Sequence, residues 1–308
     1  MAFALLFPGQ GSQSLKMMDG FADVSIVRQT FDEASRCLGD DLWAMLQAET
    51  NDRINATVYT QPLMLVAGVA TWRAWLEQGG TLPDAVAGHS LGEYTALVAA
   101  GALDFVDAVR LVRLRAELMQ HAVPVGQGAM AAVLGLDDDS IRAACAEAAS
   151  HGAVDAANFN APGQVIIAGE CLAVEQAIAL CKARGAKRAL RLPISVPSHC
   201  RLMNSAAEQL RMALNDVEFC RPRITVLHNA DVTSYSQDSA IREALVRQLS
   251  SPVRWTETIQ KLYAEGCGQM AECGPGGVLT GLVKRIDSRI TCWAFTDPAA
   301  LTMALSLC

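Results

Sequence analysis

The chain has 308 residues, 51% hydrophobic and 19% charged, which is the composition of a globular protein with one large domain or two unequal ones. Its formal net charge of −7 gives no support to nucleic-acid binding. No segment approaches the roughly 20 consecutive apolar residues that a membrane span needs. We therefore expect neither nucleic acid nor a membrane among its partners.

Ten cysteines are scattered along the chain without a Cys-x-x-Cys pair, which argues against a zinc site or a redox motif. Cys145 and Cys181 fall at apolar positions of predicted helices, where buried, reduced thiols are typical. The N-terminus starts with an apolar, strand-like run and no basic segment, unlike a signal peptide. These features predict a cytoplasmic protein. Because no phosphate loop, zinc-type helix or EF-hand pattern occurs, we expect neither metal nor cofactor.

In chain order, predicted strands alternate with predicted helices over most of the sequence, which indicates an α/β fold with a mostly parallel sheet and flanking helices. A first helix is expected to begin near Leu15, and Asp104 and Asp238 are expected to cap later helices. The predicted strands are residues 3–7, 84–88, 224–227, 268–272 and 291–295. The predicted helices are residues 60–78, 91–101, 104–121, 200–215, 238–249, 255–265 and 298–306.

Two joints that carry proline, residues 123–128 and 192–197, separate a compact segment from the rest of the chain. The segment is predicted as strand–helix–strand–strand–helix–strand, the order of a ferredoxin-like unit. Its strands are residues 129–135, 154–159, 164–168 and 188–192, and its helices are residues 138–150 and 172–184. We therefore expect a small ferredoxin-like α+β subdomain, residues 127–193, inserted into a large domain of residues 1–126 and 194–308.

The most informative motif is Gly88-His89-Ser90-Leu91-Gly92, a Gly-x-Ser-x-Gly segment. Between a strand and a helix, this pattern is typical of a nucleophile elbow, a strained turn that lifts the serine hydroxyl clear of the sheet. The motif also occurs in ordinary strand-to-helix turns. The apolar run before it and the helix-favouring residues after it favour the catalytic interpretation, so Ser90 is the predicted nucleophile.

A serine hydroxyl becomes a good nucleophile only when a base removes its proton, and the chain offers five histidines. His199 lies on the second joint just before a helix, where it can reach into a cleft between domains; the alternative is a plain loop residue. His89 adjoins the serine and is expected to be structural, because adjacent elbow residues point in different directions. His121 and His151 are expected at the surface, and His228 in the core.

An acid that would orient the imidazole is harder to find. Asp216, Asp231, Glu272 and Asp287 follow Ser90 in the chain, but none lies in a motif. A backbone carbonyl can hold an imidazole tautomer as a carboxylate does, so the residues alone leave this partner open.

The run Phe7-Pro8-Gly9-Gln10-Gly11-Ser12-Gln13 follows the first predicted strand. Ligands collect at the carboxyl ends of strands in α/β sheets, and the flanking glycines let the backbone N–H of Gln10 be presented openly. An oxyanion hole needs such a donor besides the N–H of the residue after the nucleophile, here Leu91. The alternative is a plain strand-to-helix turn.

Three arginines, Arg110, Arg113 and Arg115, lie on the helix after the elbow. Such a set usually forms a solvated face. The functional alternative is that one guanidinium turns inward and binds a carboxylate bidentately. Helical spacing places Arg113 about 160° from Arg115, so at most one of that pair faces the nucleophile.

Four motifs then occur in a characteristic order: Gly9-Gln10-Gly11-Ser12-Gln13, Gly88-His89-Ser90-Leu91-Gly92-Glu93-Tyr94, Pro197-Ser198-His199 and Gly274-Pro275-Gly276-Gly277-Val278-Leu279. With them, the chain resembles the malonyl-CoA:acyl-carrier-protein transacylase family. The resemblance covers essentially the whole length and includes Tyr59-Thr60-Gln61-Pro62, residues 158–164 and residues 248–255.

The resemblance implies a hydrolase-like α/β domain that carries the ferredoxin-like subdomain. It implies that Ser90 is the nucleophile, His199 its base and Arg115 the group that holds the substrate carboxylate. It also implies an oxyanion hole made by the N–H groups of Gln10 and Leu91, a Gln248 carbonyl that orients His199, and a cleft lined by Gln61 and Asn160.

The implied activity is transfer of malonyl from malonyl-CoA to the phosphopantetheine thiol of acyl carrier protein through a malonyl-serine, which supplies fatty acid elongation. Malonyl-CoA and the phosphopantetheine arm are then substrates, the carrier protein is a transient partner, and the enzyme is a monomer without a cofactor. The alternatives are a broader acyltransferase of a polyketide or other malonyl-using system, a thioester or ester hydrolase, and a non-catalytic scaffold.

Acyl carrier proteins are acidic as a class, so docking on an acidic chain requires a local basic patch. For each candidate patch, the alternative is a solvated helix face. The candidates are Lys182, Lys187, Arg188 and Arg191 on the small subdomain, and Lys284, Arg285 and Arg289 near the C-terminus.

Overall fold

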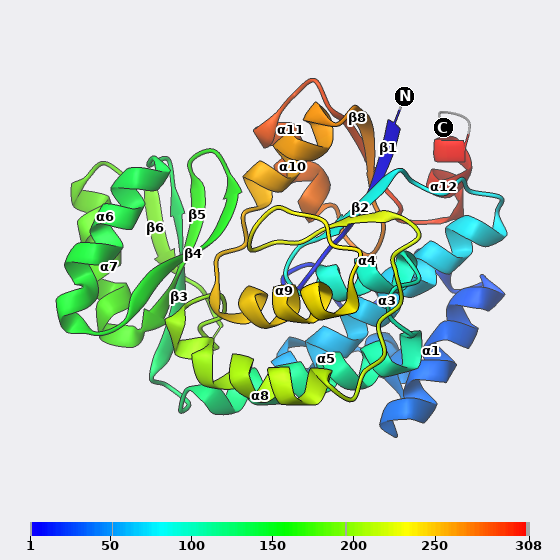
Figure 1. The fold of residues 1–308 in the computed structure, drawn as a ribbon, viewed down its shortest axis with the longest axis horizontal. Helices are drawn as coiled ribbons and strands as arrows, with labels where there is room; N and C mark the ends of the chain where they lie inside the picture. Colours follow the sequence, from blue (N-terminus) through cyan, green and yellow to red (C-terminus); the bar gives the residue numbers. More distant parts are fainter. Residues whose placement is uncertain (1, 51, 195, 306–308) are drawn as a thin grey trace.

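Two sheets organise the protein, whose structure is a computed structural model that describes residues 2–50, 52–194 and 196–305 (Figure 1). The first sheet is parallel, in the order β7 (Thr225–Leu227), β2 (Ala85–Gly88), β1 (Ala2–Phe7), β8 (Cys267–Glu272) and β9 (Thr291–Ala294). The second is antiparallel, in the order β4 (Val154–Ala161), β5 (Gln164–Glu170), β3 (Gly128–Leu134) and β6 (Arg188–Arg191). The predicted fold class, a hydrolase-like parallel sheet plus a ferredoxin-like unit, is confirmed.

The central strand β1 is buried on both faces. Because successive side chains of a strand point to opposite faces, Phe3, Leu5 and Phe7 join one core while Ala4 and Leu6 join another. A strand covered by helices on both sides is therefore continuously apolar, as β1 is.

Helices cover both faces of the parallel sheet, with α10 and α11 on one side and α3 and α5 on the other (Figure 1). The second core draws on α10 (Trp255–Ala264) and α11 (Val278–Ile286). The first core draws on α1 (Ser25–Leu38), α2 (Leu42–Gln47), α3 (Thr57–Glu77), α4 (Gly92–Ala99), α5 (Phe105–Ala122), α8 (Asn204–Leu214), α9 (Asp238–Ser250) and α12 (Pro298–Leu305).

The antiparallel sheet packs α6 (Asp138–Ala148) and α7 (Cys171–Ala183) on one face. Its other face carries Met130 and Ile166, which pack with Ile194 and Cys200 where the chain returns to the parallel sheet. The Phe159 N–H donates to the Val253 carbonyl at 2.9 Å, which ties β4 to the large unit. One apolar face of the small sheet is thereby turned toward the parallel sheet.

All strands and helices of the antiparallel unit fall within the predicted subdomain, residues 127–193. The exact domain boundaries stay a prediction. Ser195 of the second joint and residue 306 of the predicted last helix lie outside the described residues. None of the helices in the described ranges combines the length and apolar character that a membrane crossing requires.

Several expectations about single elements are wrong. No helix begins near Leu15; turns and a short 3-10 helix, Asp19–Phe21, precede α1 at Ser25. The predicted helix 200–215 is confirmed over α8, and only its first turn differs, being a 3-10 helix. Asp238 is not a cap: it is the first residue of α9, whose N-cap is Gln237. Asp104 does cap α5, accepting from the N–H groups of Val106 and Asp107 at 2.8 and 3.2 Å.

Three helices, α1, α2 and α11, have no counterpart among the predicted elements. Neither α1 nor α11 has a side-chain hydrogen bond at its N-cap, so their first turns carry no local sequence signal. Helix α2 is capped by Asp41 but spans six residues, too few to show a helical period.

The turn from β2 to α4 places Ser90 at the carboxyl edge of the parallel sheet. Ser90 has a φ of 53°, a left-handed conformation that residues with a side chain rarely adopt. A Cβ on Gly88 would lie 1.9 Å from the main chain of Gly92, and one on Gly92 would lie 2.1 Å from the Phe7 carbonyl oxygen. Glycine is therefore required at both positions, because backbone occupies the space of a side chain.

Gly92→Ala is expected to destabilise the protein by about 3 kcal/mol or more, because the Phe7 main chain is held inside the sheet. Gly281→Ala is the control: nothing lies within 4 Å of its added Cβ, and alanine favours the helix by about 0.5–1 kcal/mol. Thermal unfolding measures both changes. Equal midpoints for the two variants would contradict the packing argument.

Candidate active site

A cavity of about 280 Å³ lies between the two sheets. The large unit contributes the loop after β1, the elbow and α5, and the small sheet contributes Met130 and Ile166. Its wall is mainly apolar with a few convergent polar groups, which is typical of a small-molecule site. Among the described residues, no group of three or more His, Cys, Asp and Glu side chains is placed to hold a metal ion.

Ser90 and His199 meet in this cavity, with Ser90 Oγ 2.6 Å from His199 Nε2. His199 also has a left-handed backbone, with a φ of 60°, and its N–H donates to the Leu249 carbonyl at 3.2 Å. Such strained residues cost about 1–3 kcal/mol each and persist where the surrounding structure enforces them. At this distance, an imidazole nitrogen can take the hydroxyl proton.

Burial keeps the His199 ring neutral. The residue is 1% exposed; burial lowers the pKa of His199 to about 3, and the charge of Arg115 acts in the same direction. His199 Nδ1 lies 2.8 Å from the Gln248 carbonyl oxygen. A carbonyl only accepts, so Nδ1 carries the proton and the lone pair of Nε2 faces Ser90.

The acids considered from the sequence do not orient this ring. Within the described residues, none of Asp216, Asp231, Glu272 and Asp287 hydrogen-bonds to His199. Three of them have partners elsewhere: Asp231 bonds to Arg247, Glu272 to Thr280 and Asp287 to Arg289.

The loop after β1 lies against the elbow. A Cβ on Gly9 would lie 2.4 Å from the His89 carbonyl oxygen and 3.6 Å from the Leu91 amide nitrogen. Gln10 and Leu91 both line the cavity beside Ser90, and neither backbone N–H donates to another described residue. Both donors are therefore available for the oxyanion hole expected from the sequence.

Arg115 is the inward-facing arginine of α5. It is 1% exposed, whereas Arg110 lies at the surface and Arg113 forms an ion pair with Glu117 at 2.8 Å. This outcome follows from the helical spacing, which puts Arg113 and Arg115 on nearly opposite faces.

The Arg115 guanidinium is held by neutral groups. One terminal nitrogen donates to Gln61 Oε1 at 2.7 Å, and the other lies 2.9 Å from Gln248 Oε1 and 3.3 Å from Ser90 Oγ. No carboxylate among the described residues forms an ion pair with it, and burial lowers the pKa of Arg115. Because a buried, unpaired charge is costly, this guanidinium is suited to an anionic group of a ligand.

Gln61 and Asn160 both line the cavity. Asn160 Oδ1 lies 2.8 Å from His89 Nε2, and the His89 ring contacts Trp255 edge-on at 5.3 Å between centroids. His89 therefore forms part of the cavity wall without bonding to the nucleophile. The other predictions for histidines are confirmed: His121 and His151 are exposed, and His228 is buried.

The sequence patterns missed the polar residues beneath the elbow. Asn229 Oδ1 accepts from the Ser90 N–H at 2.7 Å, and Glu93 accepts from the Asn229 N–H at 2.9 Å. A charged residue in the otherwise apolar start of α4 is a signal that could have drawn attention to Glu93. Asn229 carries no such signal, because it lies in a loop between β7 and α9.

This fold and site are those of an acyltransferase. The sequence model of the acyl transferase domain matches residues 4–288, and the chain belongs to that family. The malonyl CoA-acyl carrier protein transacylase of Salmonella typhimurium is 53% identical over 305 residues, with 99% of each chain covered.

Two solved structures are similarly close. The acyl-carrier-protein S-malonyltransferase of Burkholderia pseudomallei is 54% identical with a TM-score of 0.98, covering 99% of this chain and 100% of that one. A malonyl-transacylase solved in complex with a type II PKS acyl-carrier protein is 53% identical with a TM-score of 0.98, and both chains are covered completely.

Because the pKa of His199 is lowered, we expect the reactivity of Ser90 to change little between pH 7 and pH 5. An ordinary histidine with a pKa near 6.5 loses about 25-fold of its neutral form between pH 7 and pH 5. With a pKa of about 3, His199 stays neutral over this range. The rate of Ser90 sulfonylation by phenylmethanesulfonyl fluoride should therefore change by less than about threefold. An inflection near pH 6.5 would contradict this.

Proposed function

We propose that the protein transfers the malonyl group of malonyl-CoA to the phosphopantetheine thiol of acyl carrier protein, through a malonyl-serine, and so supplies fatty acid elongation. The observation that carries this proposal is the buried Arg115 guanidinium 3.3 Å from Ser90 Oγ, without a carboxylate partner among the described residues. An acyl group without a free carboxylate, such as acetyl, would leave the charge of Arg115 unpaired, whereas a malonyl group brings a carboxylate to it. The names of the similar proteins point to the same substrate pair.

In the first half-reaction, His199 Nε2 takes the Ser90 proton while Oγ attacks the thioester carbonyl. The carbonyl oxygen becomes an oxyanion, which the N–H groups of Gln10 and Leu91 stabilise. The C–S bond then breaks, the imidazolium returns its proton to the leaving thiolate, and malonyl-Ser90 remains. In the second half-reaction, the phosphopantetheine thiol of the carrier protein attacks this ester by the reverse sequence.

The substrate carboxylate also prepares the base. The positive charge of Arg115 helps to lower the pKa of His199. A carboxylate on Arg115 offsets that charge, so it raises the proton affinity of the imidazole once the substrate is in place. Arg115 therefore links acyl recognition to proton transfer.

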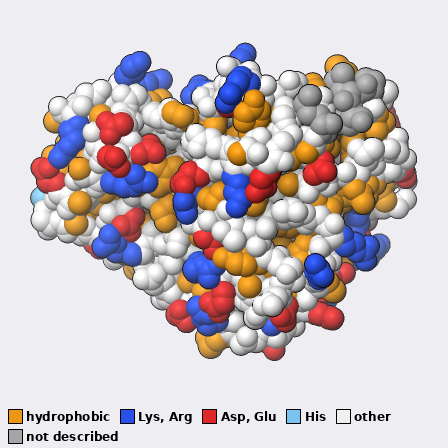
Figure 2. Space-filling view, turned by 45° about the horizontal axis from the view of Figure 1, so that its top comes forward, with side chains coloured by type: hydrophobic (Ala, Val, Ile, Leu, Met, Phe, Trp, Pro, Cys, Tyr) orange, Lys and Arg blue, Asp and Glu red, His pale blue; other side chains and the backbone are white. Residues whose placement is uncertain are grey.

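We propose that the acyl carrier protein docks on the basic patches predicted from the sequence. On the face in Figure 2, Lys and Arg side chains are interspersed with Asp and Glu over much of the surface, so attraction has to be local. Arg285 donates to Gln164 Oε1 of β5 at 2.7 Å, which places one patch beside the small sheet. The patches are Lys182, Lys187, Arg188 and Arg191, and Lys284, Arg285 and Arg289.

A cytoplasmic location is part of the proposal. All nine cysteines within the described residues are free thiols. Reduced cysteines are typical of a reducing compartment. No cofactor takes part in the proposed reaction, since each proton and acyl transfer is assigned to Ser90, His199 and the two substrates.

Ser90→Ala tests the nucleophile. Mixing the wild type with malonyl-CoA should add a malonyl mass to the intact protein, and Ser90→Ala should show no adduct because it lacks the attacking oxygen. Ser198→Ala, which removes another hydroxyl from the cavity wall, is the control and should keep the adduct. A substantial adduct on Ser90→Ala would rule out the assigned nucleophile, and rapid malonyl-CoA hydrolysis without carrier protein would favour a hydrolase.

Arg115→Ala tests the carboxylate site. It should lower malonyl transfer about 10- to 100-fold, the loss expected for a charged hydrogen bond, while acetyl transfer is relatively spared. Steady-state transfer from the two acyl-CoA donors measures the ratio. Arg110→Ala, an exposed arginine of the same helix, should leave both rates near those of the wild type. Equal losses for the two donors would remove the proposed role of Arg115.

A further inference from the structure

Glu93 is a buried carboxylate whose partners surround the nucleophile. It lies in the first turn of α4, three residues after Ser90, and is 0% exposed. Its Oε1 lies 2.8 Å from His228 Nδ1, and its Oε2 accepts from the Asn229 N–H at 2.9 Å and from Gln248 Nε2 at 3.0 Å. A carboxylate accepts at both oxygens, so it satisfies these groups together. The site described so far does not use this charge.

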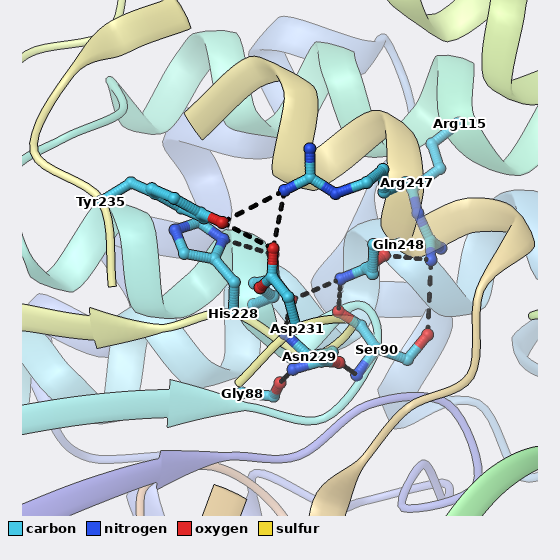
Figure 3. Close-up of polar contacts among 10 residues, drawn as sticks. Gly88, Ser90, Arg115, His228, Asn229, Asp231, Tyr235, Arg247 and Gln248 are labelled. Carbon is cyan, nitrogen blue, oxygen red and sulfur yellow. Dashed lines mark hydrogen bonds and ion pairs between the residues drawn. The ribbon is translucent and has the colours of Figure 1, made fainter. Parts of the chain in front are cut away.

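The first branch from Glu93 runs through Asn229 to the elbow. While Glu93 holds the Asn229 main chain, Asn229 Oδ1 accepts from the Ser90 N–H and Nδ2 donates to the Gly88 carbonyl, both at 2.7 Å. Figure 3 shows Asn229 between Gly88 and Ser90. These two bonds brace the turn in which Ser90 keeps its φ of 53°.

The second branch runs through Gln248 to the guanidinium and the imidazole. Gln248 Nε2 donates to Glu93 and to the Ser90 carbonyl at 2.8 Å, so its Oε1 is turned to Arg115, 2.9 Å away. Figure 3 shows Gln248 reaching both Arg115 and the main chain of Ser90. The main-chain carbonyl of the same residue holds His199.

A single neutral amide thus separates two buried opposite charges. Burial lowers the pKa of Arg115, and the charge of Glu93 acts in the opposite direction. With an amide in place of Glu93, the charge is lost and only one of the two side-chain atoms still accepts, so a donor faces either His228 or Gln248 Nε2. Where this donor faces Gln248 Nε2, the Gln248 side chain has to shift, and the guanidinium loses its fixed direction. Glu93, together with the Ser90 carbonyl, therefore fixes which end of the Gln248 amide faces Arg115.

We propose that Glu93 is a positioning residue that braces the nucleophile through Asn229 and, through Gln248, aims Arg115 at the free carboxylate of the acyl group. This inference rests on the proposed function, because only a donor with a free carboxylate can report the direction of Arg115. If Glu93 were merely structural, its substitution would lower the rates of Ser90 acylation by all acyl donors by the same factor. If Glu93 positions Arg115, its substitution lowers the rate of malonylation more than the rate of acetylation.

Glu93→Gln is the closest variant in shape that removes the charge. Its test is the single-turnover rate of Ser90 acylation, followed by intact-protein mass, with malonyl-CoA and acetyl-CoA in separate reactions. We expect acetylation to fall about tenfold and malonylation about 100-fold, so that the malonyl-to-acetyl ratio falls about tenfold. A folded Glu93→Gln protein with an unchanged ratio overturns the proposal.

Tyr235→Phe is the matched control. Its hydroxyl donates to Asp231 at 2.7 Å and accepts from Arg247 at 3.4 Å, and its ring lies 5.4 Å from that of His228. The variant therefore removes two hydrogen bonds next to the network without touching its two branches. Both rates and their ratio should stay within about twofold of the wild type. A fall in the ratio equal to that of Glu93→Gln would show that any nearby loss has this effect, and would overturn the proposal.

Gln248→Met covers the case in which Glu93→Gln does not fold. It keeps the main-chain carbonyl that holds His199 and removes the amide between Glu93 and Arg115. The malonyl-to-acetyl ratio should fall as in Glu93→Gln, and an unchanged ratio overturns the inference. Failure of the proposed function looks different: the wild type itself would then form no adduct with malonyl-CoA.

Discussion

The chemistry of this protein depends on one short hydrogen bond, from Ser90 Oγ to His199 Nε2, between residues 109 positions apart in the chain. Both residues have left-handed backbone conformations, which are unfavourable for any residue with a Cβ. Two sets of backbone contacts hold these residues in their unfavourable conformations. The elbow is locked because glycine lets the main chain of β1 and α4 approach it, and His199 is held by backbone contacts with the end of α9.

Charge in the cavity is organised through neutral groups. Arg115 is fixed by the side-chain amides of Gln61 and Gln248, so its charge is directed without being cancelled by a neighbouring carboxylate. The main-chain carbonyl of Gln248 similarly fixes the imidazole tautomer without adding a negative charge beside it. A full carboxylate at either place would oppose the entry of an anionic acyl group, since like charges at close range repel strongly in a low-dielectric site.

The antiparallel sheet completes the site by covering it. Its inner face presents Met130 and Ile166 to the cavity, and β4 is hydrogen bonded to Val253 beyond α9. This apolar wall limits the access of water to an ester on Ser90, which a transferase has to protect until the acceptor thiol arrives. The small sheet thus contributes to the outcome of the reaction although the nucleophile and base both lie outside it.

The sequence by itself determined the features that depend on local chemistry. The two glycines around Ser90 identify the elbow because no other residue fits so close a backbone contact. The order of predicted strands and helices, with the two proline-bearing joints, was enough for the two-sheet architecture. His199 was a candidate because of its proline-bearing joint, and the family resemblance singled it out as the base. The helical period showed that at most one of Arg113 and Arg115 could face the nucleophile.

Only the tertiary structure decided which groups meet. The residues alone left the choice between Arg113 and Arg115 open, and the orienting carbonyl of Gln248 could not be read from its residue type, since every residue has one. The family resemblance implied both groups, and the packing of α5 and α9 supplies the physical reason. The acids considered from the sequence did not include Glu93. Its contacts with Asn229 and Gln248 join segments more than 130 residues apart. Such hydrogen bonds depend on three-dimensional proximity, which no pattern of a few residues specifies.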